Sequence, residues 1–258
     1  MKLFFRDMGG EGRPIIILHG VLGSSKNWIT AGKNLSVSGH VFALDQRNHG
    51  DSPHSDSHTL DDLVGDLDEW ISDHSARLPV LVGHSMGGLV AMAFALRYPD
   101  KISGILVVDI APKAYRETNR DEFAAISVDV SQAKNRSEID AKMKAFVPDA
   151  TVRQFLQMNL ESLNSGGYRW KIPVEVLKKA DFSDGMDSLL LMRSYSGPAL
   201  FILGGKSPYV SGEDFPAIKK FFPSAKIEVL PDADHWLHFS AAADFQRLAA
   251  EFLSRLKT

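Results

Sequence analysis

The sequence predicts an α/β fold with a mostly parallel sheet and helices on both of its faces. Several short apolar runs end in Gly, Asp or His, and stretches with helical periodicity lie between them. This alternation is typical of βα units, whose parallel strands are buried on both faces. With 258 residues, of which 44% are hydrophobic and 24% charged, the chain is long enough for one substantial core and a smaller cap.

The strands are predicted where Val, Ile and Leu gather in short runs. These runs are residues 15–19, 41–45, 80–84, 105–109, 199–203 and 226–230. Three helices are predicted with them. The first begins at the N-cap Thr59, has acidic residues in its first turn and ends near His74. The second covers residues 85–98 and stops before Pro99, and the third begins at about Ala241.

The stretch from Pro112 to about Leu190 follows a different pattern. It contains no strand-like run, and Glu, Lys, Asp and Met alternate with isolated apolar residues. It separates the run that ends at Asp109 from the run that begins at Ala199, whereas connections in α/β proteins usually have ~2–6 residues. We therefore expect residues 1–111 and 191–258 to form the core, and residues 112–190 to form a helical insertion that acts as a lid over an active site.

Composition and charge exclude several classes of protein. The net charge of −3 and the absence of a basic run argue against a nucleic-acid partner. The chain has no cysteine, which excludes disulfides, thiolate metal sites and a cysteine nucleophile. The first residues form too short an apolar stretch for a signal peptide, and no run approaches the ~18 apolar residues of a membrane span. We expect a soluble cytoplasmic protein, and the sequence leaves its oligomeric state open.

The candidate nucleophile is Ser85. The apolar run 80–84 leads directly into Gly83-His-Ser85-Met-Gly87 and then into a helical pattern, which is the context that a G-x-S-x-G motif requires. A serine at such a sharp turn has a strained backbone that exposes its hydroxyl, and the flanking glycines let neighbouring chain segments pass closely. This pattern predicts nucleophilic catalysis by Ser85.

The candidate base is His235, because a serine hydroxyl needs a general base within hydrogen-bond reach. His235 follows the last predicted strand by a short turn, which places it at the carboxyl edge of the sheet, where α/β folds bind ligands. His238 is a weaker candidate, since it lies at the start of the last helix. A metal site built from these histidines with Asp232 and Asp234 lacks an open coordination motif, so we expect neither a metal nor a cofactor.

Two backbone N–H groups are expected to form an oxyanion hole. One belongs to Met86, the residue after the nucleophile. The other belongs to Val21, in the turn that follows the first predicted strand. His19, which precedes this turn, is expected to support the loop.

Four motifs in order along the chain resemble the α/β-hydrolase superfamily. They are His19-Gly20, the loop Asp45 to Ser52, Gly83-His-Ser-Met-Gly87 and Asp234-His235. More narrowly, HGVLGSS, RNHGDSP and GGKSPYV resemble the bacterial YbfF-type esterases, small carboxylesterases that are also associated with acyl-CoA thioester cleavage. The resemblance implies a small ester or thioester substrate and a lid inserted between strands 6 and 7 of the family's sheet.

The triad acid is the point at which the chain departs from the usual pattern. Most members of the superfamily place it just after the strand that ends here at Leu203, but this chain continues with Gly-Gly-Lys-Ser-Pro. Asp109, at the end of the adjacent strand, is the alternative, and the YbfF-type resemblance implies this same position. A buried carboxylate between Val and Ile is costly without a polar partner, which also favours a role for Asp109. Other acids remain possible, namely Asp232, Asp234, Glu213 and Asp214, and Ser207 is a possible support near His235.

The residue pattern leaves the substrate undetermined. Candidates for an apolar pocket are Leu22, Met143, Phe146, Phe155, Met158 and Trp236. We expect hydrolysis of carboxylic esters, or of acyl-CoA thioesters, through an acyl-enzyme on Ser85. The alternatives are a carbon–carbon bond hydrolase or lyase acting on a dicarbonyl substrate, and a non-enzymatic ligand receptor on the same scaffold. Dehalogenases and epoxide hydrolases of this fold are excluded, because they use an aspartate where this chain has Ser85.

Overall fold

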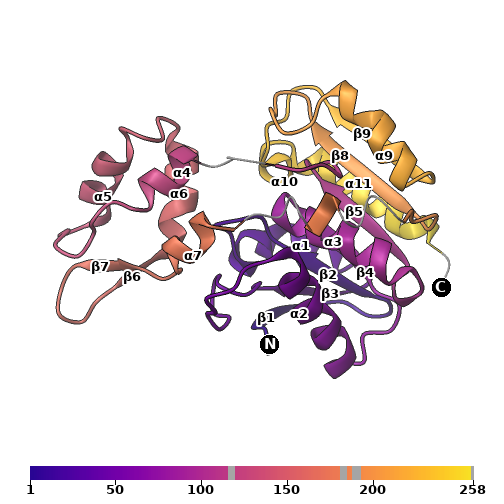
Figure 1. Ribbon diagram of the computed structural model, residues 1–258, viewed down its shortest axis with the longest axis horizontal. Coiled ribbons are helices and arrows are strands. Elements are labelled where there is room, and N and C mark those ends of the chain that lie inside the picture. Colours follow the sequence, from indigo (N-terminus) through magenta and orange to yellow (C-terminus); the bar gives the residue numbers. More distant parts are fainter. Residues whose placement is uncertain (116–119, 181–184, 188–192, 257–258) are drawn as a thin grey trace.

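A computed structural model describes residues 1–115, 120–180, 185–187 and 193–256, and it confirms the α/β fold (Figure 1). A seven-stranded sheet has the order β1-β3-β2-β4-β5-β8-β9, and only β1 is antiparallel to its neighbour. The strands are β1 (Phe5–Gly9), β2 (Pro14–Leu18), β3 (His40–Leu44), β4 (Val80–His84), β5 (Gly104–Val108), β8 (Ala199–Gly204) and β9 (Ala225–Leu230).

All six predicted strands are confirmed, while β1 was not predicted. The central strands β4 and β5 are buried along their whole length, which explains their apolar sequences. In contrast, β1 lies at the edge of the sheet and is only half-buried. Its sequence Phe-Arg-Asp-Met-Gly has no continuous apolar run, and its pairing with β3 shifts register between Asp7 and Gly9.

Helices cover both faces of the sheet, as predicted. One face packs against α2 (Leu60–Asp73), α3 (Met86–Arg97) and α9 (Phe215–Phe221), and the other packs against α1 (Ile29–Leu35) and α11 (Ala242–Arg255). The N-cap Thr59 accepts a hydrogen bond from Asp62 N–H at 3.1 Å, as its place before the helix indicates. The prediction omitted α1. Shorter helical segments in the core are α10 (Leu237–Ser240) and the 3₁₀ helices Ser25–Trp28, Pro99–Lys101 and Gly212–Asp214.

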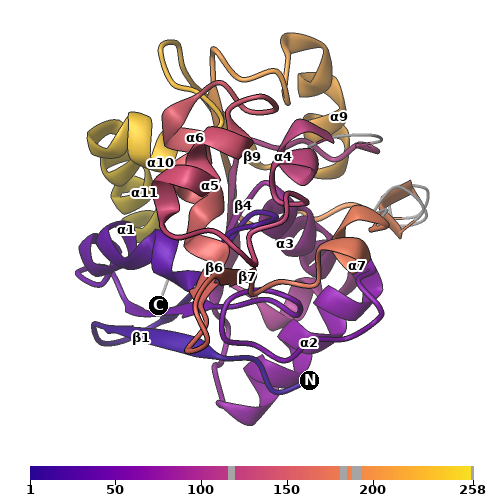
Figure 2. The same cartoon turned by 90° about the vertical axis from the view of Figure 1, so that its left-hand side faces the viewer.

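The stretch between β5 and β8 forms a separate body beside the sheet, at the left in Figure 1 and facing the viewer in Figure 2. It contains α4 (Arg120–Ala125), α5 (Arg136–Met143), α6 (Ala150–Leu156), the 3₁₀ helix Gln157–Asn159 and α7 (Val174–Lys178). Its helices enclose a further apolar cluster, which includes Ile126, Ile139 and Leu156 and which Leu22 of the core joins. We call residues 112–190 the insertion; its predicted end at residue 190 lies outside the described residues.

One expectation about the insertion was wrong in detail. The insertion is not purely helical, because β6 (Leu160–Ser162) and β7 (Tyr168–Trp170) form an antiparallel hairpin. Strands of three residues are too short to show a periodicity, and the hairpin depends on Gly166 and Gly167, which both have positive φ. The insertion separates β5 from β8, which are parallel neighbours in the large sheet.

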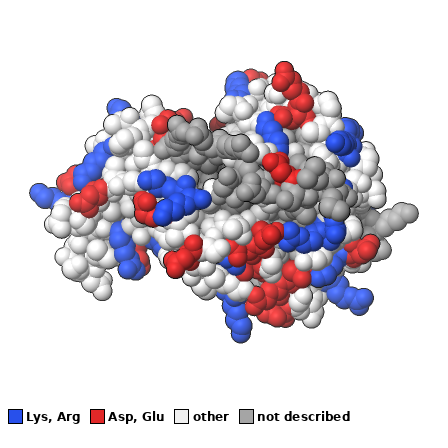
Figure 3. Space-filling model, in the orientation of Figure 1, with Lys and Arg blue, Asp and Glu red and all other residues white. Residues whose placement is uncertain are grey.

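The surface carries charges of both signs. On the face shown in Figure 3, Lys and Arg side chains are interspersed with Asp and Glu side chains over both the insertion and the core. Among the described residues, no helix is both long enough and apolar enough to cross a membrane.

Candidate active site

The sharp turn between β4 and α3 carries Ser85. Its φ is +49° and its ψ is −119°, a combination that non-glycine residues rarely adopt. A hydrogen bond of 3.0 Å from Ser85 N–H to the Val108 carbonyl holds the turn against β5. The residue is therefore fixed at the carboxyl edge of the sheet, in the strained conformation that the motif predicts.

The two motif glycines are required by close approaches of the backbone. A Cβ at Gly83 would lie 2.2 Å from the carbonyl oxygen of Gly87, and a Cβ at Gly87 would lie 2.2 Å from the carbonyl oxygen of Leu18. No side chain fits at such distances. The glycines thus let the start of α3 approach both β4 and the end of β2, which brings the nucleophile turn next to the loop after β2.

The side chains of His235 and Asp109 form a buried hydrogen-bonded pair. His235 lies in the turn after β9, and its Nδ1 is 2.6 Å from Asp109 Oδ2. Asp109 directly follows β5 and has a φ of +52°, which turns its side chain toward His235. With Nδ1 bound to the carboxylate, the proton-accepting nitrogen of the ring is Nε2.

Further donors surround the Asp109 carboxylate. Oδ1 accepts a hydrogen bond of 2.8 Å from Gly204 N–H, and Oδ2 accepts one from the Ser207 hydroxyl. The carboxylate is fully buried, so these bonds compensate for its lost hydration. Ser207, expected near His235, therefore acts on the acid instead.

The other candidate acids are engaged elsewhere. Asp232 is exposed and pairs with Lys206 at 3.0 Å, and Asp214 pairs with Lys113 at 2.8 Å. Asp234 accepts hydrogen bonds from its own turn, from the Trp236 N–H and the Ser240 hydroxyl, both at 2.8 Å. Glu213, in the 3₁₀ helix before α9, is exposed.

The imidazole of His235 is packed from two sides. The ring of Tyr209 stacks on it, with centroids 3.9 Å apart and planes at 20°. Burial raises the pKa of Tyr209 to about 12, so its phenol is protonated at neutral pH. The second neighbour is His84, the residue before Ser85 in the G-x-S-x-G motif, whose ring centroid lies 4.7 Å from that of His235. Its Nε2–H donates a hydrogen bond of 2.9 Å to the main-chain carbonyl of His235. His84 thus ties the turn that carries His235 to the turn that carries Ser85.

The loop after β2 presents a free backbone donor. Leu22 has a φ of +61°, and its N–H donates to His49 Nε2 at 3.1 Å, while Gly23 N–H donates to the Gly20 carbonyl at 3.0 Å. Within the part of the chain that the structure describes, no acceptor takes the Val21 N–H. Met86 begins α3, where first-turn N–H groups have no intrahelical acceptor.

Two neutral histidines hold this loop in place. His19 Nε2 accepts the Gln46 N–H at 3.0 Å, and its Nδ1 donates to the Gly20 carbonyl at 2.8 Å. His49 has the same tautomer, since Nε2 accepts from Leu22 and Nδ1 donates to the Arg47 carbonyl at 2.9 Å. Burial lowers the pKa of both rings, that of His49 well below the usual value. His19 therefore lies behind the loop, as expected.

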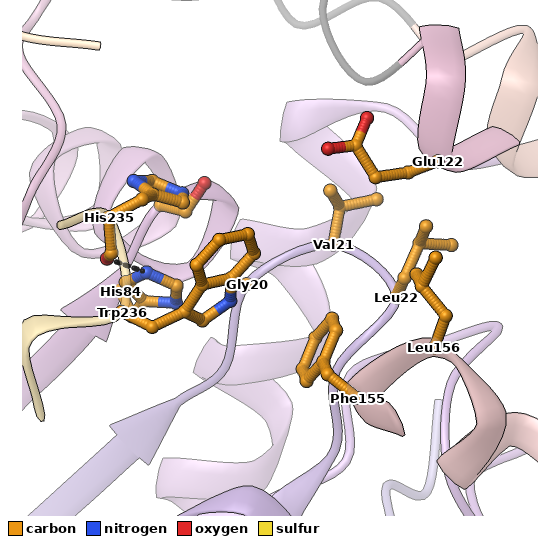
Figure 4. A pocket seen from close by; sticks show the side chains of 10 residues that line it. Gly20, Val21, Leu22, His84, Glu122, Phe155, Leu156, His235 and Trp236 are labelled. Atoms are coloured by element: carbon orange, nitrogen blue, oxygen red, sulfur yellow. Dashed lines mark hydrogen bonds between the residues drawn. The ribbon is translucent and has the colours of Figure 1, made fainter. Parts of the chain in front are cut away.

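These residues meet at a small cavity of ≈ 20 Å³ (Figure 4), which is room for about one water molecule. Its wall consists of Gly20, Val21, Leu22, His84, Ser85, Glu122, Phe155, Leu156, His235 and Trp236. A larger cavity of ≈ 700 Å³ adjoins it and shares Phe155 and Trp236. The rings of these two residues, one from the insertion and one from the core, have centroids 6.0 Å apart.

Comparison with known proteins agrees with this geometry. Residues 13–242, most of the chain, match the family model described as the alpha/beta hydrolase fold. The chain belongs to the α/β-hydrolase family. The expected enzyme class, hydrolase, is thereby confirmed.

Relatives of this hydrolase are similar over nearly its whole length. It is 35% identical over 262 residues to the zebrafish (Danio rerio) sn-1-specific diacylglycerol lipase ABHD11, covering 96% of this chain and 80% of that protein. It is 33% identical over 244 residues to esterase YbfF of Escherichia coli, covering 92% and 93%. Among solved structures, a marine microorganism esterase shares 37% identity with a TM-score of 0.88, covering 97% and 99%. The resemblance to YbfF-type esterases is confirmed.

The structure places the six pocket candidates of this hydrolase differently. Leu22, Phe155 and Trp236 line the small cavity, and Met158 lines the larger one. Met143 lies in neither, because it is fully buried in the insertion's own core. Phe146 also lies in neither and is partly exposed. In both cases the apolar residue type suggested a pocket, but the packing within the insertion decided the direction of the side chain.

Sequence reasoning missed two polar side chains of the hydrolase site. His84 stands inside the serine motif, and the variable position it occupies gave no reason to examine it. Glu122 lies on the short helix α4 among other charged residues, where no motif distinguishes it from a solvated surface glutamate. Among the described residues, no group of three or more His, Cys, Asp or Glu side chains is arranged to hold a metal.

Proposed function

We propose that this chain hydrolyses carboxylic esters through an acyl-enzyme intermediate on Ser85. The observation that carries the proposal is the buried hydrogen bond between His235 and Asp109 beside a serine at a strained strand-to-helix turn. Ser85 and His235 line one cavity with Val21, so nucleophile, base and an oxyanion donor converge on one space. The names of the relatives, a diacylglycerol lipase and two esterases, support the same substrate class.

In the acylation half-reaction, the Ser85 Oγ attacks the acyl carbon while His235 Nε2 takes its proton. Asp109 holds Nδ1–H and stabilises the imidazolium that forms. The Val21 and Met86 N–H groups donate to the oxygen of the tetrahedral intermediate. As the intermediate collapses, His235 returns the proton to the leaving alcohol and the acyl group stays on Ser85.

Water then hydrolyses the acyl-enzyme by the same route. His235 takes a proton from the water as it attacks the acyl carbon, and the proton passes to Ser85 Oγ when the acid product leaves. These steps use only side chains and backbone groups of the chain. The same sequence would cleave an acyl-CoA thioester, with a thiol in place of the alcohol.

We also propose that the insertion, residues 112–190, is a lid that binds the acyl chain. The cavity at Ser85 has only ≈ 20 Å³ and is too small for an acyl chain. The adjoining ≈ 700 Å³ has the size of a small-molecule site. Its apolar wall includes Phe155 and Met158 from the insertion and Trp236 and Phe239 from the core. The Phe155–Trp236 contact lies between the two spaces, so its movement would join them.

Replacement of the nucleophile tests the proposal. Ser85→Ala should abolish hydrolysis of p-nitrophenyl esters while the circular dichroism spectrum and the melting temperature stay close to those of the unmodified protein. An organophosphonate should add one adduct to the parent chain, at Ser85, and none to the variant. Ser72→Ala, at a surface serine of α2, is the matched control and should remain active.

Product analysis separates the alternatives. An acyl adduct on Ser85 that forms and decays at the turnover rate supports ester hydrolysis. Substantial turnover by Ser85→Ala, or labelling of another residue, would exclude the assignment. A carbon–carbon hydrolase or lyase would act on dicarbonyl compounds without acylating Ser85, and a receptor would bind a ligand without turning it over.

A further inference from the structure

The cavity at Ser85 contains a carboxylate that the proposed mechanism does not use. Glu122 belongs to α4 of the insertion, and it lines the cavity together with Ser85 and His235. Figure 4 shows its side chain extending over Val21 toward the side of the cavity where His235 lies. The insertion thus brings a carboxylate close to the loop after β2, which carries the proposed oxyanion donor Val21.

Among the side chains that the structure describes, this carboxylate has no ion-pair partner. No described side chain donates a hydrogen bond to it, and the phenol of Tyr209 has its pKa raised to about 12 by burial and by the charge of Glu122. Its neighbours in the cavity wall are mainly apolar, with Leu22, Phe155 and Leu156 among them. Its place in the first turn of α4 is favourable for an acidic side chain, but this does not require the carboxylate to extend into a mainly apolar cavity wall. A negative charge beside an oxyanion loop also opposes the charge that develops during catalysis, which leaves recognition of substrate as its use.

We propose that Glu122 is a specificity-determining residue that selects esters by charge and hydrogen bonding. Its carboxylate accepts a hydrogen bond from a hydroxyl group of the substrate, or binds an ammonium group, and it repels a substrate carboxylate close to the scissile bond. The substrate class is therefore a neutral ester that carries a free hydroxyl group, or a cationic ester. This inference rests on the proposed ester hydrolysis and adds the polarity of the substrate to it.

The expected discrimination is large enough to measure. A hydrogen bond to a charged acceptor corresponds to roughly 10- to 100-fold in affinity. Repulsion between two like charges a few Å apart near a protein surface corresponds to about tenfold or more, and it weakens as salt is added. An alternative role, electrostatic support of the His235 imidazolium, would instead change the turnover of every ester by the same factor.

Three matched pairs of esters test the proposal by their ratios of kcat/KM. Choline butyrate is compared with its uncharged carbon isostere, glycerol monobutyrate with propyl butyrate, and monoethyl succinate with ethyl pentanoate. The variants are Glu122→Gln, which removes the charge, and Glu122→Lys, which inverts it. The matched control is Asp121→Asn, the neighbouring residue of α4, which loses the same charge but is exposed and lies outside the cavity wall.

In the parent protein, kcat/KM should be higher for choline butyrate and for glycerol monobutyrate than for their partner esters. It should be lower for monoethyl succinate than for ethyl pentanoate. Glu122→Gln should move each charged-to-neutral ratio by about tenfold toward unity and should also lower the ratio of glycerol monobutyrate to propyl butyrate. It should leave propyl butyrate and ethyl pentanoate, which offer Glu122 neither a hydroxyl nor a charge, within about twofold of the parent. Glu122→Lys should raise kcat/KM for monoethyl succinate relative to that for ethyl pentanoate. Rising salt should shrink the charge preferences of the parent and of Asp121→Asn, and have little effect on Glu122→Gln.

Two results would overturn the inference. One is a set of ratios in Glu122→Gln equal to those of the parent, and the other is an equal loss for all esters. Both differ from failure of the proposed function itself, in which the parent protein hydrolyses none of the neutral esters and Ser85 is not labelled by an organophosphonate.

Discussion

The side chain of Asp109 shows how one residue departs from the usual order and still reaches its partner. The carboxylate receives hydrogen bonds from His235, Gly204 N–H and the Ser207 hydroxyl, so a buried charge is fully solvated by the protein. In the turn after β8, where an acid is usual, the chain has Ser207. The hydroxyl at that position instead supports an acid supplied by the adjacent strand β5.

Replacing Asp109 by Asn should reduce turnover far more than folding. An amide facing Nδ1 favours the wrong imidazole tautomer, and in serine proteases the corresponding change lowered kcat about 10⁴-fold. We expect a loss of the same order in kcat for a p-nitrophenyl ester, with a cooperative unfolding transition retained. Asp232→Asn is the control, because that carboxylate is exposed and pairs only with Lys206 at the surface. An Asp109→Asn variant with a tenth of the parent kcat would show that another group orients His235.

Motif residues could be placed from the sequence because their chemistry demands a particular backbone. Ser85 needs a glycine on either side, and His235 needs to follow a strand, so both are recognisable without a structure. Asp109 required knowledge of which strands are neighbours, which the family resemblance supplied. Glu122 could not be found in this way, since its place at the cavity depends on how the insertion packs on the core.

Strands and helices differ in whether their burial produces an apolar pattern that can be recognised in the sequence. The five inner strands, β2, β3, β4, β5 and β8, have apolar runs because helices cover both faces of the sheet, and α2 shows its N-cap and its apolar stripe together. The edge strand β1 and the hairpin β6–β7 have too few buried residues to produce a pattern. α1 has seven residues, fewer than the two to three turns over which helical periodicity becomes clear.

The proposed lid leads to a prediction about chain length that concerns α6. Phe155→Ala should open the contact with Trp236 and shift the preferred acyl chain of p-nitrophenyl esters toward greater length, since it joins the two cavities. Phe146→Ala makes the same change in the insertion at a residue outside both cavities, and its ester profile should match that of the parent. Identical profiles for the two variants would place the acyl chain elsewhere.

Met143→Ala should behave differently from both. Its side chain is fully buried among the apolar residues of the insertion, so the variant should lose about 2–5 kcal/mol of stability in that region without a change in chain-length preference. A shift in preference at full stability would mean that this methionine contacts substrate.

The molecule as a whole buries several histidines in their neutral form around the active site. Burial lowers the pKa of His58 to about 4 and that of His238 to about 3, and it lowers the pKa of His49 and His84 well below the usual value. The histidines of the unfolded chain have ordinary pKa values near 6.5. Below that pH they bind protons, while the buried histidines of the folded chain stay neutral. Stability from these groups is therefore complete above about pH 6.5 and falls as the pH drops toward the folded values.

The free energy of unfolding should fall steeply with acid between about pH 6 and pH 4. Each such histidine contributes a slope of about 1.4 kcal/mol per pH unit in this window, and His58 and His238 together contribute about 3. Urea titrations at several pH values measure this slope. His238→Phe keeps an aromatic ring stacked on Trp28, whose centroid lies 4.3 Å from that of His238, but removes the titrating group. For His238→Phe, the slope of the unfolding free energy against pH should be smaller by the contribution of one histidine, about 1.4 kcal/mol per pH unit. An unchanged slope would show that His238 is not a source of the acid sensitivity.

The serine of the elbow occupies a backbone conformation that glycine adopts freely. With φ at +49° and ψ at −119°, Ser85 carries a strain of roughly 1–3 kcal/mol, which Ser85→Gly would relieve. Only selection for turnover opposes that change, because activity and stability place conflicting demands on this position. If the proposed function holds, the hydroxyl at this turn is kept at a cost in folding free energy, and Ser85→Gly should gain thermal stability as it loses activity.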